Sequence, residues 1–343
     1  MKDNIKIFDL DFNEFDLLPK AVSLGNFDGV HKGHQKLMKE NIKISKAKNL
    51  TPSVLLFKEN TKNILNGERE YLTSLEDKIE ILKNLGIECF CLLEFSDKFK
   101  DLSPYEFIEK ILYKKLNTKY VIVGDNYRFG KMAKGDIKTL KKYEEDFAYK
   151  TKVVDFELDD GKIINSTDIR QMVREGKIEK ANKDLGHPFK MQGKVIKGAQ
   201  RGRLLNFPTA NLKPSFKYVT AKSGVYFTRV NIDRDFYYAL TDIGTNPTFE
   251  NKKMKIETYI MDFSKDIYGK NISIEFLEYL RPDYKFNSPE ELIAQMEKDK
   301  KTGRKLIEKY RKEEETALFL CSNLFLILLG IYNIEFKIVI WKF

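Results

Sequence analysis

Cysteine is scarce in this chain of 343 residues, which contains only Cys89, Cys91 and Cys321. An odd set without paired metal spacing argues against a disulfide framework and against a cysteine metal site, and it is typical of reduced thiols in a cytosol. The start of the chain also lacks an apolar stretch, because residues 1–13 are charged, so the sequence predicts no signal peptide. We therefore expect a cytoplasmic protein.

A strong excess of one charge is missing as well. Lys and Arg number 61 and Asp and Glu 51, which gives a net charge of +10. This charge suits nucleic acid, a membrane surface or small anionic substrates, but the two signs alternate along segments such as residues 138–146, as on an ordinary solvated surface. No known nucleic-acid recognition motif appears, so we expect no nucleic-acid partner. The length predicts about two domains.

A glycine-punctuated stretch near the start of the chain carries the clearest chemical signal. An apolar strand end at residues 21–24 runs into residues 25–34, whose three glycines let the backbone turn sharply before a helix begins. Unpaired N–H groups at a helix start bind anions. His31 and His34 lie in this turn, where imidazoles can donate hydrogen bonds to a phosphate. The alternative is an ordinary turn that the histidines merely cap, but the paired histidines favour a phosphate site.

The first half of the chain alternates strand-like runs with amphipathic helical segments. Strands are expected at residues 21–24, 53–57, 88–95, 120–124 and 151–156, with helices at 33–49, at 74–85 and from 103 onward. Ser74 with Asp77 three residues later is a typical helix start. Ser103, Pro104 and Glu106 form another. This alternation predicts a doubly wound parallel α/β sheet, with ligands at the carboxyl ends of its strands.

Two further motifs are expected at those strand ends. Residues 124–130 offer an aromatic face, an amide and a cation, so that a flavin or purine ring could stack there; a tight loop with one buried aromatic is the alternative. In residues 165–170, Ser166 and Thr167 are expected to cap a helix that carries Arg170. Hydroxyls, a helix start and a guanidinium together predict a second phosphate-binding element, although a plain helix cap is the alternative.

The pattern changes near residue 185. Gly186 and Pro188 end the helical run at 177–184 and mark a domain boundary. The β-rich runs that follow lie at residues 189–196, 224–232, 235–241, 255–263 and 272–277. Because no helix separates them, they predict a small closed antiparallel barrel, followed by one helix capped by Ser288.

The second half carries its own candidate chemistry. Residues 193–203 are glycine-spaced and basic, as suits a flap over phosphates. Thr209 and Asn211 are two residues apart, so in an extended segment their oxygens face the same way and suit Mg²⁺ beside phosphates, although such a segment also occurs readily in loops. Glu257 lies in an otherwise core-like strand, either as a solvent-facing residue or as a general base for an attacking hydroxyl.

Together these motifs resemble the bacterial bifunctional riboflavin kinase/FAD synthetases, whose first domain belongs to the His-x-Gly-His nucleotidyltransferases. The motifs that carry the resemblance start at Gly25, Gly124, Asn165, Gly193, Phe207, Ser223, Asp242, Glu257, Asp262, Tyr268 and Leu280 and cover about residues 20–310. The resemblance implies an α/β doubly wound nucleotidyltransferase domain at residues 1–184. It also implies a riboflavin kinase β-barrel domain with a carboxyl-terminal helix at 185–312, followed by an apolar tail at 313–343.

The resemblance also implies two reactions and their residues. Riboflavin is phosphorylated to FMN by ATP, and FMN is then adenylylated by a second ATP to FAD and pyrophosphate. His31, His34 and Arg170 would stabilise adenylyl transfer, and Glu257 would activate the riboflavin hydroxyl. The implied Mg²⁺ ligands are Thr209 and Asn211. The implied substrate- and nucleotide-binding residues are Gly25, Phe27, Asp28, Gly29, Gly33, Asn126, Tyr127, Phe129, Ser166, Thr167, Gly193, Gly198, Arg203 and Arg281.

The chain departs from the family pattern at a few positions. Tyr127 replaces a phenylalanine, Asn165 a serine and Asn206 a glycine. Residues 57–61 lack the usual Phe-x-Pro-His-Pro stretch, which we expect to affect the efficiency of adenylylation more than its existence. Pantetheine-phosphate and nicotinate-mononucleotide adenylyltransferases share His-x-Gly-His, but the flavin-type second half argues against them.

The end of the chain is the one long apolar run. Residues 316–334 are uncharged and would span roughly 28 Å as a helix, close to the hydrocarbon thickness of a bilayer. Of three interpretations, an extension of non-native origin such as a shifted reading frame is favoured over a membrane anchor, and packing on the barrel ranks third. The expected partners are the small molecules riboflavin, FMN and ATP, with membrane contact only through this tail, and an oligomer is left open.

Overall fold

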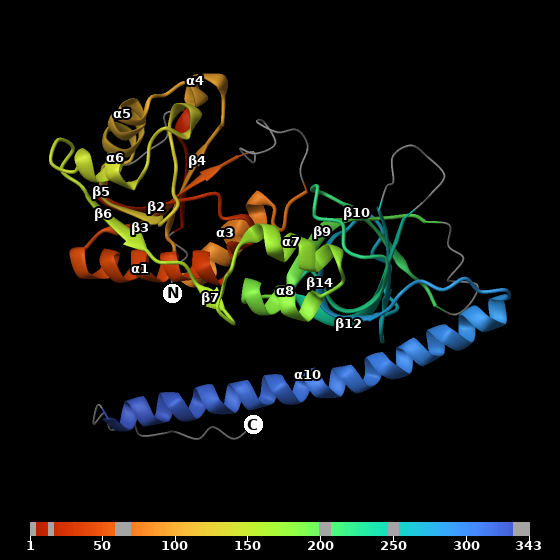
Figure 1. Cartoon of the computed structure of the whole chain (residues 1–343). Coiled ribbons are helices and arrows are strands. Elements are labelled where there is room, and N and C mark those ends of the chain that lie inside the picture. Colours follow the sequence, from red (N-terminus) through yellow and green to blue (C-terminus); the bar gives the residue numbers. More distant parts are fainter. Residues whose placement is uncertain (1–4, 13–16, 59–69, 199–206, 246–253, 332–343) are drawn as a thin grey trace.

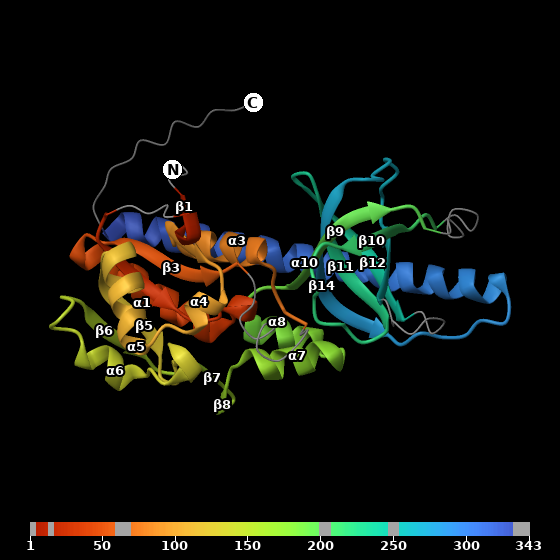
Figure 2. The same ribbon diagram turned by 90° about the horizontal axis from the view of Figure 1, so that it is seen from above.

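The computed structural model describes residues 5–12, 17–58, 70–198, 207–245 and 254–331, with the backbone alone at residues 245 and 317–331. The chain forms a parallel sheet with helices, a closed barrel and one long helix, α10 (Pro289–Ile331). Figures 1 and 2 show the sheet and the barrel side by side, with helices α7 (Ser166–Arg174) and α8 (Ile178–Leu185) between them.

The parallel sheet confirms the predicted α/β fold. Its strands are β1 (Lys6–Asp9), β2 (Lys20–Leu24), β3 (Thr51–Phe57), β4 (Cys89–Leu93), β5 (Thr118–Gly124) and β6 (Lys150–Val154). They pair in parallel in the order β1-β4-β3-β2-β5-β6, so the sheet has one strand more than expected. The extra strand, β1, lies at the edge of the sheet beside β4. It was not predicted, because it is short and lies among charged residues in the sequence.

Helices cover both faces of this sheet. They are α1 (Lys32–Lys48), α3 (Leu75–Leu85), α4 (Asp97–Lys100), α5 (Pro104–Glu106), its π-helical continuation Phe107–Lys115, and α6 (Ile137–Lys142). On β5, Val121 and Val123 pack with the π-helix and α6, while Ile122 packs in the cluster of α1 and α3. Alternate residues of one strand thus enter two cores, as in a doubly wound fold.

Sequence predicted several helix starts, and one of them was wrong. Ser74 with Asp77 and Ser103 with Glu106 both form the expected capping boxes. Helix α7 is capped instead by Asn165, whose Oδ1 accepts from the N–H groups of residues 167 and 168. The predicted caps, Ser166 and Thr167, are already helical and cannot cap their own turn. A two-stranded ribbon, β7 (Leu158–Asp159) and β8 (Lys162–Ile163), precedes this helix.

The antiparallel barrel is closed, as predicted. Its strands are β9 (Phe189–Ile196), β10 (Ala210–Pro214), β11 (Gly224–Ile232), β12 (Asp235–Thr245), β13 (Met254–Ile260) and β14 (Asn271–Arg281), in the order β10-β13-β12-β11-β14-β9. Strand β10 was not predicted, because Ala, Asn, Lys and Pro are poor strand formers. After the barrel, Ser288 caps α10 as expected, since its Oγ accepts from the Glu291 N–H.

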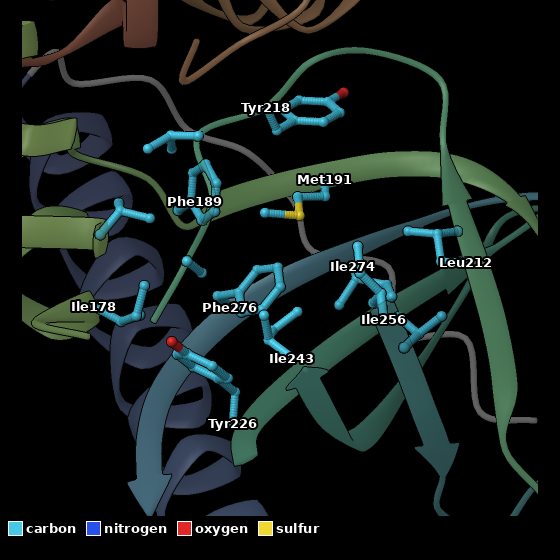
Figure 3. Packing of buried hydrophobic residues seen from close by; sticks show 14 of the residues in the cluster. Ile178, Phe189, Met191, Leu212, Tyr218, Tyr226, Ile243, Ile256, Ile274 and Phe276 are labelled. Carbon is cyan, nitrogen blue, oxygen red and sulfur yellow. The ribbon is translucent and has the colours of Figure 1, made fainter. Parts of the chain in front are cut away.

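One hydrophobic core joins the barrel to helices α7 and α8. Ile169 and Val173 of α7 and Ile178 of α8 belong to the same buried cluster as Phe189 and Phe276 inside the barrel. Figure 3 shows Ile178 beside the aromatic rings at this end of the barrel. The helix that begins with the 165–170 motif is therefore fixed to the barrel by burial of apolar surface.

Helix α10 covers part of the outside of the barrel. Ile307 packs with Val225, Phe227, Leu240 and Met261 in a separate cluster on the outer side of the strands. Among the residues that were described in full, no helix is both long enough and apolar enough to cross a membrane. The side chains of the apolar tail lie outside the described residues, so its interpretation stays a prediction.

Candidate functional site

A cavity of about 970 Å³ opens where the first sheet's parallel strands end. Its wall includes the residues that follow β2, β5 and β6, as expected for ligand sites in doubly wound sheets. The predicted site residues that line it are Gly25, Phe27, Asp28, His31, Gly33, His34, Asn126, Tyr127, Phe129, Ser166, Thr167 and Arg170. The structure thus brings three motifs, from distant parts of the chain, to one cavity.

The two histidines of the cavity lie against each other. The rings of His31 and His34 stack with centroids 3.7 Å apart. Burial lowers the pKa of His31 to about 4, and burial followed by the charges of His31 and Lys78 lowers the pKa of His34 well below 6.5. Both imidazoles are therefore neutral at pH 7, when each can donate one hydrogen bond.

Neither histidine serves as a helix cap. His31 directly precedes α1, but its side chain makes no capping hydrogen bond. Within the described part of the chain, the buried Nδ1 atoms of His31 and His34 have no hydrogen-bond partner. Unpaired buried polar atoms are costly and rare. The rings of both histidines line the cavity, although these two nitrogens are themselves closed off from solvent.

The turn that leads into the histidines is strained. Phe27, Gly29 and Val30 have positive φ angles, and that of Val30 is 38°, a region that β-branched residues rarely adopt. Such strain persists only where surrounding contacts hold the backbone. Gly29 does not line the cavity; its N–H donates to Thr73 Oγ1 at 2.9 Å, and a Cβ here would lie 2.8 Å from a Leu72 methyl carbon.

Asp28 is fully engaged within the protein. Its Oδ1 accepts from the N–H groups of Leu72 and Thr73 at 3.0 and 3.3 Å. Its Oδ2 accepts from Arg170 Nη1 at 2.6 Å, and its backbone oxygen accepts from Ser166 Oγ at 2.8 Å. Asp28 thus ties the turn to α7, and these contacts suit a positioning role better than direct ligand contact.

Aromatic side chains form another wall of the cavity. The rings of Tyr127 and Phe129 are nearly parallel, with centroids 5.8 Å apart. Sequence reasoning missed Phe57, Phe95 and Phe99, which also line the cavity and contact one another edge-on or tilted. They follow two neighbouring strands, β3 and β4, and no single stretch of sequence places them together.

The candidate residues of the second half lie on the outside of the barrel. On β13, Ile256 is in the barrel core, so its neighbour Glu257 points outward. Asn211 of β10 is paired with Glu257 on one side, and Asp242 of β12 is paired with it on the other. Thr209 lies two residues before Asn211. The side chains of Asn211, Glu257 and Asp242 thus form a row across adjacent strands, and all three are half-buried.

Asp242 is a residue of this row that sequence reasoning did not single out. Its burial raises its pKa to about 7, with further contributions from Asp283 and then from Glu257. Lys255 Nζ lies 3.0 Å from Glu257 Oε2 and offsets part of this negative charge. A charged residue between Thr241 and Ile243, both buried, was the available signal.

Two glycines allow close approach in the barrel, and one of them, Gly198, lies against the row. A Cβ on Gly193 would lie 2.2 Å from the Lys213 carbonyl oxygen, and one on Gly198 would lie 2.3 Å from Asn211 Nδ2. Only glycine fits at such distances, so residue 198 lies directly over Asn211.

Arg281 was expected to bind substrate or nucleotide. Its Nε and Nη2 atoms lie 3.0 and 2.7 Å from Asp299 Oδ2, and its guanidinium lies over the Tyr284 ring at 5.0 Å. The pair joins the end of β14 to α10 beside the row. Some residues of the motifs named above lie outside the described residues. They are Arg203, Asn206 and residues 59–61 and 246–249.

Comparison with known proteins gives two family matches. Residues 15–168 match FAD synthetase, and residues 185–307 match riboflavin kinase. The bifunctional riboflavin kinase/FMN adenylyltransferase of Listeria monocytogenes is 37% identical over 85% of this chain and 94% of that protein. The proteins of the same name from Bacillus subtilis and Escherichia coli K12 are 35% and 31% identical, over 85% and 83% of this chain and 94% and 91% of those proteins.

A solved structure also shares the fold. The crystal structure of a macrolide-efflux protein from Streptococcus pneumoniae superposes with a TM-score of 0.81 and 32% sequence identity. The match covers 88% of this chain and 99% of that protein. Both the sheet and the barrel therefore have a counterpart in one experimental structure.

Proposed function

Because the chain belongs to the family of bifunctional riboflavin kinase/FMN adenylyltransferases, we propose how its own residues divide the two reactions. The protein phosphorylates riboflavin to FMN with ATP and adenylylates FMN to FAD. We assign adenylyl transfer to the cavity at the strand ends, in a domain of residues 1–184. We assign the kinase reaction to the outer face of the barrel, in a domain of residues 185–312.

The stacked histidine pair carries the first assignment. An oxygen of the FMN phosphate attacks the α-phosphorus of ATP, and the bond to the pyrophosphate oxygen breaks. The protein needs no nucleophile, because the FMN phosphate is already ionised at neutral pH. His31 and His34 are neutral imidazoles whose rings line the cavity, so each can donate one hydrogen bond to the charge that develops on the phosphate oxygens. Arg170, which is paired with Asp28, adds a cation to the lining of the same cavity.

The aromatic wall supports a place for the flavin. Tyr127 and Phe129 present nearly parallel rings to the cavity, and Asn126 adds an amide beside them. A flavin is a large, planar and partly polar ring, which such a wall binds by stacking while the amide fixes its orientation. The same cavity also takes the ATP, because His31, His34, Ser166, Thr167 and Arg170 all line it.

The row on the barrel supports the kinase assignment. Glu257 accepts the proton of the riboflavin 5′-hydroxyl. The hydroxyl oxygen bonds to the γ-phosphorus of ATP at the same time, and the bond from that phosphorus to the ADP oxygen breaks. Thr209 and Asn211 fit Mg²⁺, because they bring neutral oxygens to the outward side of β10, beside Glu257. When bound there, Mg²⁺ would neutralise charge on the ATP phosphates. Gly198 lets its backbone approach Asn211 closely.

A cytoplasmic location agrees with the thiols of the chain. Cys89 and Cys91 are buried and form no disulfide, with sulfur atoms 3.8 Å apart. Reduced thiols are typical of the cytosol. The substrates of the two reactions are small molecules, which need no further partner. Membrane contact through the tail and an oligomeric state stay predictions.

One variant tests the division of labour between the sites. The purified full-length protein is incubated with riboflavin, Mg²⁺ and ATP, and the flavins are separated by chromatography. His31→Ala should abolish FAD formation while FMN still accumulates, because the residues that line the cavity all precede the barrel in the chain. If the folded variant also loses FMN formation, or if it still makes FAD at the normal rate, the assignment of the histidines is wrong.

A further inference from the structure

The segment between the two domains contacts the strained turn of the adenylylation site. His187 Nε2 lies 3.0 Å from the backbone oxygen of Gly29, and its Nδ1 lies 2.9 Å from the Pro188 oxygen. Gln35 makes a second tie, because its Nε2 donates to the backbone oxygens of both Val30 and Leu185, at 2.9 and 2.7 Å. Two side chains therefore connect the turn at residues 27–30 to residues 185–188.

These contacts act where the backbone would otherwise relax. Gly29 and Val30 have positive φ angles, and His31 follows directly. A carbonyl oxygen only accepts hydrogen bonds, so the bond to Gly29 forms when Nε2 of His187 carries a proton. Losing this bond frees the Gly29 peptide to rotate, and any rotation there redirects the backbone that leads into His31.

The position of His187 is itself fixed by the barrel. Asn182, on α8, donates from Nδ2 to the Phe276 oxygen at 2.8 Å and accepts at Oδ1 from the Phe189 N–H at 2.7 Å. It therefore holds α8 to β14 and to the start of β9, on either side of residues 185–188. The hydrophobic cluster of α7, α8 and the barrel buries the same junction. His187 thus projects from a rigid base.

We propose that His187 is a positioning residue for adenylyl transfer, which holds the strained turn at residues 27–30 so that His31 is aimed at the reacting phosphate. The barrel end of the junction then supports the backbone of the adenylylation site from outside the cavity, in addition to carrying the kinase face. This inference rests on the proposed placement of adenylyl transfer at the histidine pair. His187 does not line the cavity, so its effect is on geometry and not on contact with substrate.

The test compares three full-length proteins: the unaltered chain, His187→Ala and His187→Gln. For His187→Ala, kcat of FAD formation should fall about tenfold to hundredfold, the usual effect of a small misplacement of catalytic groups. KM for FMN and for ATP should change less than about twofold, because the aromatic wall is intact. His187→Gln keeps an N–H donor and should recover a large part of kcat. FMN formation by the same samples should be unchanged.

A matched control separates positioning from general stability of the junction. Lys190→Gln breaks the ion pairs of Lys190 with Asp77 and Glu80 at the same junction without touching the turn. It should keep kcat of FAD formation. If His187→Ala does not fold, as judged by loss of both activities and of circular dichroism, Gln35→Leu replaces it. That variant removes the second tie and should lower the same kcat.

Several results would overturn the proposal. They are a normal kcat for folded His187→Ala, an equal loss in His187→Gln, or the same loss in Lys190→Gln. His31→Ala is assayed in parallel to distinguish the two levels of the argument. If His31→Ala leaves FAD formation intact, the placement of the site is wrong. If His31→Ala abolishes it and His187→Ala does not lower it, only the role of His187 is wrong.

Discussion

At the scale of single residues, the proposed chemistry of the kinase face rests on Glu257. Glu257→Gln keeps the shape of the side chain and removes the base. FMN synthesis should fall about 10²–10⁴-fold, the usual contribution of a positioned general base, while FAD synthesis from supplied FMN continues. Assays of both reactions on one preparation measure this. Glu275→Gln is a matched control, since it alters a strand carboxylate paired with Arg229; near-normal kinase turnover of the Glu257 variant would refute the role.

A second prediction at this scale concerns Asp242 and pH. Burial and the neighbouring carboxylates raise its pKa to about 7, against an ordinary value of 3.8. Between about pH 4 and pH 7, the Asp242 carboxyl is protonated in the folded state and ionised in the unfolded state. The free energy of unfolding therefore falls as pH rises through this range. Asp242→Asn should therefore raise the melting temperature more at pH 8 than at pH 4, measured without Mg²⁺. An equal shift at both pH values would contradict this.

The residues of the sites were predictable where chemistry is local, and hidden where it is not. The histidine pair stood out because its residue types and spacing are unusual in a short stretch of sequence, whereas the roles expected of Arg170 and Glu257 depended on the family resemblance. Phe95 and Phe99 did not, because an aromatic residue beside a strand is normally core. His187 was noted only as part of a boundary, since its contact with Gly29 spans 158 positions of the sequence. Only folding creates such contacts.

At the scale of elements, the cap of α7 links local structure to the adenylylation site. Asn165→Ala removes the acceptor of two backbone N–H groups, which costs about 1 kcal/mol of helix stability. Because α7 carries Arg170 and Ser166 to Asp28, FAD formation should fall together with the melting temperature. Asn165→Ser is the matched control, since serine caps equally well. Loss of FAD formation in the serine variant, with the alanine variant normal, would show that the cap is not the reason.

Helices and strands with strong local signals were predicted well. Both capping boxes appeared where Ser was followed by an acidic residue three positions later, and the long strands of both sheets matched their apolar runs. Strands β1 and β10 were missed because they are stabilised by pairing and not by propensity. The missed prediction of β10 mattered, because the pairing of β10 with β13 places Asn211 beside Glu257.

At the scale of the whole molecule, the two proposed sites share one scaffold. Helices α7 and α8 pack in the barrel core while α7 reaches back to Asp28 in the first cavity. The junction is also polar: Asp77 of α3 pairs with Lys190 at 3.0 Å and accepts from the Tyr218 hydroxyl at 3.0 Å. Surfaces of this kind, apolar inside and ion-paired around, hold domains in a fixed relation. We therefore expect the two sites to keep their relative placement during turnover.

The last prediction concerns the end of the chain. Helix α10 contacts the barrel through the ion pair of Asp299 with Arg281 and through the packing of Ile307 and Tyr310. These residues all lie before residue 313. After residue 312, the described side chains add only one ion pair with the barrel, between Glu314 and Arg229. Glu314 is exposed, and exposed ion pairs contribute little to stability. The riboflavin kinase match ends at residue 307. A chain that ends at Lys312 should thus keep both activities and be more soluble, because it lacks the apolar run.

Activity and solubility assays of the two chains check this directly. A shorter chain that ends at residue 304 is the control: it loses Ile307 and Tyr310, so its barrel should melt at a lower temperature. If the chain ending at Lys312 loses either activity, the tail is part of the working structure, and its packing on the barrel becomes the favoured interpretation. If the full chain is recovered only from membranes with detergent, while the truncated chain is not, the tail is an anchor. If both chains are recovered without detergent, and the truncated chain is more soluble and fully active, a non-native extension is the explanation, because an apolar run that neither packs nor anchors has no structural use.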